Sequence, residues 1–393
     1  MKRINIVVIL ILVFLSSFSI CDSTAYANEE GLKEDLENQV EDHINSIISP
    51  ELEDYFNRLK TNLGVDFTFK DFLKSIISGE TPLTIESIGG FFNNAFRKEL
   101  KYTFLSLLNV IVLSIISSLS GHLSSGFKKD STKQIVSWVI YGTIIATLAI
   151  SIGSFVVTTK SIIDDLSTFL DLFTPIIVTL ITALGGKAGL TILQPIALLI
   201  SNFALKLIIN VIIPIFFAIT IFTFVGNLTD TVKLDTLSKS FKSIASWALG
   251  IVFSGLMVFV SVQGLVGASI DTIGVKFSKF AISSYVPILG GYLSDGFDIV
   301  MASCVLIKNA LGLTGVLVLI TIALIPLIKI VVYSLVLKLV AGIIEPIGEV
   351  KIASLLYTTS GNLNLLIAAV GGAFFLVLTV LLIVIGSFNS GVV

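Results

Sequence analysis

The sequence predicts an all-α membrane protein that crosses the bilayer several times. Of its 393 residues, 54% are hydrophobic and only 13% are charged, against about 25% charged in an ordinary soluble protein. So few charged residues could not cover the apolar surface of a soluble fold, whereas a bilayer accepts lipid-facing apolar side chains. Apolar runs of spanning length, roughly 20 residues, recur after Tyr102. The formal net charge of −2 provides no basic field for nucleic acid.

Residues 1–27 have the pattern of a secretory signal peptide. Lys2 and Arg3 precede an apolar run from Ile4 to Leu15, and Ala25-Tyr26-Ala27 fits a cleavage site. A lipoprotein signal that uses Cys21 is the alternative, but the residue before this cysteine is bulky where a small one is expected. We therefore expect cleavage after Ala27 and a mature N-terminus outside the cytosol.

The segment from residue 28 to 101 is polar and predicted to be helical. It contains 15 of the 27 acidic residues and 8 of the 25 basic ones. A shortage of lysine and arginine suits an exported segment. Its stretch from Phe67 to Ile77 is amphipathic at helical spacing. This stretch is interpreted either as an interfacial or partner-docking helix, or as part of a small helical pack against the rest of the protein.

The third part, residues 102–393, is a predicted multi-pass membrane domain. We expect about six full transmembrane helices, in the runs Thr103–Ser120, Ile135–Thr158, Leu205–Val225, Ser246–Ala268, Gly312–Val336 and Leu363–Ile385. Two further apolar stretches, Leu172–Ser201 and Val286–Ile307, contain proline and glycine pairs. Interrupted helices are tolerated in a membrane where protein or a water-filled cavity satisfies the freed backbone groups. We expect these two stretches to form broken or re-entrant hairpins.

The distribution of lysine predicts the orientation of these crossings. If the N-terminus is outside, the loop with Lys128, Lys129 and Lys133 faces the cytosol, as the positive-inside rule requires. Later lysine-bearing positions, from residue 233 to 242 and at Lys351, fall on the same side.

The sequence also predicts a parallel internal repeat in the membrane domain, with coincidence between similar apolar segments as the alternative. The two tryptophans, Trp138 and Trp247, lie in similar segments, and Pro175 and Pro214 have counterparts at Pro287 and Pro326 with nearly the same spacing. The copies cover residues 133–232 and 242–344. Repeats of this kind occur in transporters, whose binding sites use broken helices near the midplane.

Charged and hinge-like residues within the apolar segments are the candidate functional positions, because charge is costly in a membrane. The glycine pairs are interpreted as hinges or close-packing sites. Lys308 could pair with Asp295 or Asp298, and Glu345 precedes a proline where a helix is expected to stop. The candidates are Gly185, Gly186, Lys187, Pro287, Gly290, Gly291, Asp295, Asp298, Lys308 and Glu345.

No catalytic constellation is expected from the sequence. It lacks a nucleophile elbow, a Gly-rich loop after a strand and a His-x-x-Glu pair. His43 and His122 have no ligand at metal-site spacing, and Cys21 and Cys304 suggest no disulfide framework. We therefore expect a protein that is not an enzyme and that uses no cofactor or metal.

Several runs resemble the stage III sporulation protein AE family. The most specific is Val286-Pro287-Ile288-Leu289-Gly290-Gly291 followed by Ser294-Asp295, and Lys308-Asn309-Ala310 and Glu345-Pro346 also agree. Asp171-Leu172-Phe173-Thr174-Pro175 is similar to the same family. Phe277 departs from the pattern, since a small residue is expected there.

The resemblance implies a membrane component of a channel or secretion-like complex that links mother cell and forespore and supports late forespore development. It implies insertion in the mother-cell-derived membrane around the forespore. It also implies partners, namely the other stage III sporulation AA–AH membrane proteins and a forespore channel protein. A stand-alone secondary transporter and a purely structural anchor are the alternatives.

Overall fold

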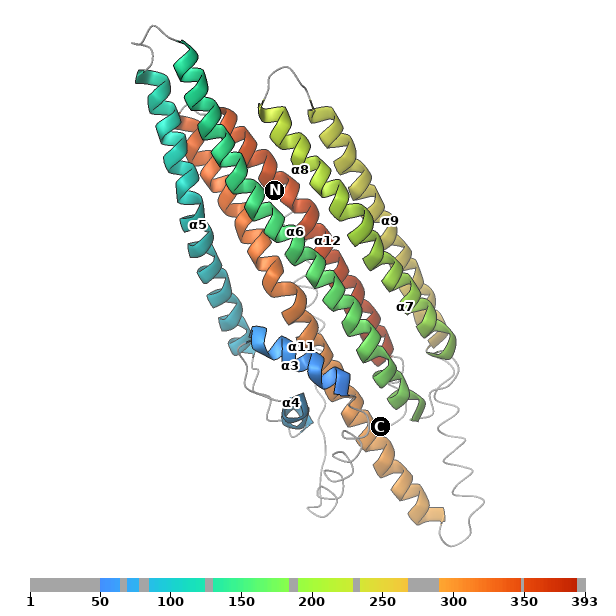
Figure 1. Ribbon diagram of the computed structural model, residues 1–393. Helices are drawn as coiled ribbons and strands as arrows, with labels where there is room; N and C mark the ends of the chain where they lie inside the picture. Colours follow the sequence, from blue (N-terminus) through green and yellow to red (C-terminus); the bar gives the residue numbers. More distant parts are fainter. Residues whose placement is uncertain are drawn as a thin grey trace. The chain divides into compact units, whose positions relative to one another are not determined.

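The computed structural model describes residues 50–63, 69–77, 85–123, 130–183, 190–228, 234–267, 290–347 and 350–386, and every element in these ranges is a helix (Figure 1). The predicted signal peptide lies outside the described residues. The helices are α3 (Pro50–Leu63), α4 (Phe69–Ile77), α5 (Ile85–Leu123), α6 (Asp130–Ala183), α7 (Leu190–Leu207), the π-helical turn η2 (Ile208–Ile212), α8 (Ile213–Leu228), α9 (Asp235–Gly267), α11 (Gly290–Ile344), the 3-10 turn η3 (Glu345–Ile347) and α12 (Val350–Gly386).

The all-α membrane fold class predicted from the sequence is confirmed. Within the described residues, five helices are long and apolar enough to cross a membrane: Asn93–Leu119, Trp138–Thr179, Pro195–Asn227, Ile307–Ile347 and Val350–Ile385. Each overlaps one of the predicted spans. The sixth predicted span, Ser246–Ala268, lies in α9 apart from its last residue. The total number of crossings stays a prediction.

Helices α11 and α12 form the most extensive helix pair in the described structure. They run antiparallel, because Ser334 contacts Ser360 whereas Gly312 lies beside Ile385, toward the opposite end of each helix. Helices α5 and α6 pack on α11, and α8 and α9 pack on α12. A helix that is apolar on all sides belongs in the interior of a bundle. The even hydrophobicity of α12 thus accounts for its central position.

The first predicted hairpin, Leu172–Ser201, consists of the end of α6 and the beginning of α7. Asn202 of α7 donates a hydrogen bond to the side chain of Asp171 on α6. Asp171 lies 12 residues before the end of α6 and Asn202 lies 12 residues after the start of α7, so the two helices run antiparallel. The expected breaks at Pro175 and Pro195 do not occur, since each proline lies inside a helix. Pro175 has no N–H group to donate to the backbone carbonyl of Asp171, four residues earlier. Both residues are exposed.

The second predicted hairpin, Val286–Ile307, is wrong for the residues that the structure describes. From Gly290 onward this stretch is the first part of α11, a helix of 55 residues that continues to Ile344. Gly290 and Gly291 begin this helix and do not interrupt it. Pro287 lies outside the described residues.

A π-helical turn is the one irregularity between α7 and α8. The backbone N–H of Ile213 donates to the carbonyl of Ile208, five residues earlier. Pro214 follows immediately and cannot donate to the carbonyl four residues before it. The wider π-helical turn accommodates the proline, and the chain continues as the helix α8.

The exported segment predicted from the sequence packs against the bundle through α3 and α4. The hydroxyl of Tyr55 on α3 donates to the backbone carbonyl of Asp165 on α6 at 2.8 Å. Leu73 of α4 is fully buried, and α4 contacts α11. Of the two interpretations, the described residues support the helical pack. The predicted domain boundary after residue 101 falls inside α5, which continues through it.

The internal repeat stays a prediction. In the first copy α6 is followed by α7, the π-helical turn and α8, whereas in the second copy the next described helix after α9 is the single long helix α11. The matched prolines Pro214 and Pro326 also differ in their surroundings. Pro214 follows the π-helical turn, whereas Pro326 lies inside the α-helix α11.

Candidate functional site

A set of hydrogen-bonded polar residues joins four helices near the ends where α9 and α12 begin. Asn362 of α12 donates to the hydroxyl of Thr223 on α8 at 2.8 Å, and both side chains are buried. Lys242 of α9 donates from Nζ to the backbone carbonyl of Gly361 at 2.6 Å. We call this set the polar seam, and its members are Thr223, Asn227, Lys242, Ser334, Ser360, Gly361 and Asn362.

The pair Ser334 and Ser360 extends the polar seam to α11. Ser360 donates to the carbonyl of Ser334 at 2.8 Å, and the two hydroxyl oxygens are 3.0 Å apart. Both residues are almost fully buried. Two serines allow the backbones to approach closely, and their mutual bonds fix the axial register of α11 on α12.

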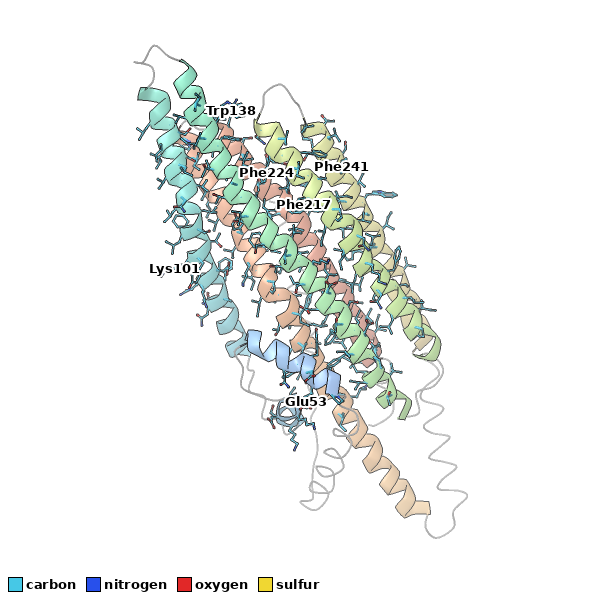
Figure 2. All side chains as sticks on the ribbon, viewed as in Figure 1. Glu53, Lys101, Trp138, Phe217, Phe224 and Phe241 are labelled. Atoms are coloured by element: carbon cyan, nitrogen blue, oxygen red, sulfur yellow. The ribbon has the colours of Figure 1, made fainter. Side chains whose placement is uncertain are left out.

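The seam lies beside aromatic contacts between α8 and α9. Phe222 and Phe241 meet edge to face with ring centroids 5.5 Å apart. Figure 2 shows Phe241 and Trp138 near the ends where α9 and α6 begin. The polar seam can therefore hold four helices together where the predicted cytosolic loops join them. Each of its polar side chains makes at least one hydrogen bond to a neighbouring side chain or backbone carbonyl, as a membrane interior requires.

A second close-packed region lies toward the other end of α11. A β-carbon on Gly315 would lie 2.9 Å from Cε1 of Phe173 on α6 and 3.1 Å from Cδ2 of Leu381 on α12. A β-carbon on Gly312 would lie 2.7 Å from Cδ1 of Ile385. Small residues that let helices approach are characteristic of membrane helix interfaces. These two glycines bring α6, α11 and α12 together.

Lys308 is the predicted candidate that the structure describes best. Its side chain is fully buried, and it lies one turn before Gly312 on the same face of α11. Because Gly312 is beside Ile385, Lys308 is level with the end of α12. The carbonyl end of a helix carries partial negative charge, so this position favours a lysine.

The remaining predicted candidates are not brought together in the described structure. Asp298 and Asp295 precede Lys308 by several turns of the uninterrupted helix α11. These separations correspond to about 15 and 20 Å along the helix axis. Glu345 is exposed in η3. Gly185, Gly186 and Lys187 lie outside the described residues, as does Pro287.

The polar seam was missed by the sequence analysis, although a signal for it exists. Thr358-Thr359-Ser360-Gly361-Asn362 is a polar run in an otherwise apolar helix. Lys242 was interpreted as a marker of the cytosolic side and as the start of the second repeat copy. Among the described residues, no group of three His, Cys, Asp or Glu side chains could hold a metal ion.

Comparison with known proteins agrees with the resemblance in the sequence. The family model of stage III sporulation protein AE matches residues 67–387. A stage III sporulation protein AE of Bacillus subtilis (strain 168) is 26% identical over 390 residues, which cover 97% of this chain and 98% of that protein. No solved structure matches the chain significantly. The family model covers most of the membrane bundle and both packing regions, and the chain belongs to the stage III sporulation protein AE family.

Proposed function

We propose that the protein is a membrane component of the stage III channel or secretion-like complex that links mother cell and forespore. Membership of the sporulation family, together with an apolar helix bundle built around α11 and α12, is the observation that carries this proposal. In this role the chain is not an enzyme. It supports late forespore development by forming or scaffolding a path across the membrane.

The proposed location is the mother-cell-derived membrane around the forespore, with the N-terminus outside the cytosol. The proposed partners are the other stage III sporulation AA–AH membrane proteins and a forespore channel protein. The packing of α3 and α4 on α6 and α11 supports this arrangement, because it gives the exported segment a fixed position from which to contact partners.

Deletion of the gene and affinity isolation of the tagged full chain test the proposal together. We expect the deletion strain to engulf its forespores and then lose most of its heat-resistant spores. We expect the tagged chain to bring down other stage III membrane proteins from sporulating cells. Normal spore yield in the deletion strain, or a chain isolated alone from gently solubilised membranes, would contradict the proposal.

A stand-alone secondary transporter is the second candidate. The π-helical turn Ile208–Ile212 favours it, since it lies near the middle of the span Pro195–Asn227 and such turns are frequent at functional sites. Purified protein in liposomes that moves a solute without partners would support this function in place of the first.

A further inference from the structure

The outer face of α6 changes from apolar to polar along its length. Ile150 and Val157 are 76% and 70% exposed, as expected for side chains in contact with lipid. Beyond Val157 the exposed side chains of the same helix face are polar. Together with neighbouring residues of α7 they form what we call the polar stripe: Lys160, Asp164, Thr168, Asp171, Asn202 and Lys206.

Hydrogen bonds hold the α6 and α7 parts of the polar stripe together. Ser167 of α6 donates to the side-chain oxygen of Asn202 on α7 at 2.9 Å. Asn202 in turn donates to Asp171 at 3.4 Å. Lys206 is exposed one turn farther along α7. The stripe is therefore one continuous surface on two helices.

The simplest explanation is that α6 leaves the bilayer after Val157, but α7 contradicts it. Phe203, the residue after Asn202, is 68% exposed, and Leu199 is 70% exposed. If the end of the bundle at this level were in water, these two large apolar side chains would be in water as well. Polar and apolar surfaces thus occur at the same level of the bundle on neighbouring helices.

Helix α9 also exposes an apolar side chain near the level of the polar stripe, as its contacts with α12 show. Lys242 contacts Gly361 and Phe253 lies against Gly372, so the two helices advance by equal steps between these contacts and run parallel. Val258 of α9, which is 65% exposed, is therefore level with Val377.

Leu381, one turn beyond Val377 on α12, lies beside Gly315. Gly315 also contacts Phe169 and Phe173 of α6. Thr168 and Val258 are thus at levels that differ by about 6 Å. One is part of a polar surface and the other of an apolar surface.

Charged side chains in a membrane almost always face the bundle interior or a water-filled cavity. We propose that the polar stripe borders a water-filled vestibule that opens on the side of the membrane where α3 packs against Asp165, and that this vestibule admits small polar or charged solutes. The proposal rests on the proposed channel function and specifies which face of this chain lines the path. Val258, Phe203 and Leu199 mark the faces in contact with lipid.

Cysteine labelling of the full chain in membranes from sporulating cells tests this assignment. Cys21 and Cys304 are first replaced by serine, and single cysteines are introduced as Thr168→Cys, Asp164→Cys, Phe203→Cys and Val258→Cys. A charged, membrane-impermeant thiol reagent is applied from each side, and labelling is normalised to that of denatured protein. We expect labelling at least about tenfold faster at residues 164 and 168 than at 203 and 258.

Two results would overturn the assignment. Equal, rapid labelling at all four positions would place this end of the bundle outside the bilayer. Equal, slow labelling would place the stripe against protein or lipid. If Asp164→Cys lowers the amount of protein in the membrane, the near-isosteric change Thr168→Cys provides the comparison, together with Ser161→Cys at an exposed position of α6 next to Lys160.

The same strains separate this inference from the proposed function. If the labelling contrast is present but a deletion strain forms spores normally, the proposed function fails and the water-facing stripe stands. If deletion abolishes spores but the contrast is absent, the sporulation role stands and this chain does not line the path through the polar stripe.

Discussion

The ring of Phe253 on α9 fills the space beside Gly372 on α12 that any side chain at position 372 would need. A β-carbon built on Gly372 would overlap the Cζ atom of this ring. The next residue before it, Gly371, has no atom within 4 Å of the corresponding position. Of these two adjacent glycines, Gly372 therefore has no room for a side chain, whereas Gly371 has.

Gly372→Ala should destabilise the protein, whereas Gly371→Ala should not. Overpacking of this kind costs about 1–3 kcal/mol, because a rigid ring cannot move aside without disturbing α9. Thermal unfolding of the detergent-solubilised protein, followed by size-exclusion chromatography, measures the difference. Phe253→Ala should relieve much of the defect in the Gly372→Ala background, and no coupling between these two changes would refute the contact.

Asn362→Leu should weaken the association of α12 with α8. The change removes the donor to Thr223, and an interhelical hydrogen bond in a membrane protein contributes about 0.6 kcal/mol and at most about 1.7 kcal/mol. A double-mutant cycle with Thr223→Val measures this coupling. Thr359→Val is the matched control, because the buried hydroxyl of Thr359 has no hydrogen-bond partner among the described residues. A larger loss of stability for the control than for Asn362→Leu would contradict the assignment.

Lys242→Met should lower stability more than Lys239→Met. Lys242 donates to the carbonyl of Gly361, while Lys239, one turn earlier on α9, is exposed. A hydrogen bond from a charged group contributes about 1.5–3 kcal/mol when buried, and partial exposure of Lys242 reduces this to about 1 kcal/mol. Both variants remove one positive charge from the same end of α9. Equal melting temperatures for Lys242→Met and Lys239→Met would show that the hydrogen bond of Lys242 to Gly361 does not contribute to stability beyond the effect of charge.

Reporter fusions should place the loops around residues 126, 231 and 348 on the cytosolic side. The helices before these positions end at the same end of the bundle. Ser118 near the end of α5 donates to the carbonyl of Ile347 in η3. The last turns of α8 contain Thr223 and Asn227 of the polar seam. Fusions near residues 186 and 278 should report the opposite side. Cytosolic activity of the fusion at 186 would mean that α6 does not cross as one helix.

The sequence predicted the helices well because lipid imposes a single, strong requirement on composition. A run of about 20 apolar residues has few alternatives to a spanning helix. Prolines and glycine pairs were weaker guides. Pro175 and Pro326 both lie inside helices, where neighbouring helices tolerate them. A proline in a membrane segment therefore did not predict a break.

The polar contacts could not be predicted in the same way, because they depend on axial register between distant helices. Thr223 and Asn362 are 139 residues apart in the chain, and nothing local indicates that they meet. Lys308 is buried in the described structure, and its functional role stays a prediction. The continuity of α11 places Asp295 and Asp298 about 20 and 15 Å before Lys308 along the helix axis, a separation that the sequence alone did not indicate.

The length of α11 has a mechanical consequence. A helix of 55 residues is about 80 Å long, whereas the hydrocarbon core of a bilayer is only about 30 Å thick. Because α11 is one continuous helix, a displacement or rotation at one of its ends is transmitted to the other end with no flexible loop in between. Pro326 is the only proline in it, and any bending under such a load should concentrate there.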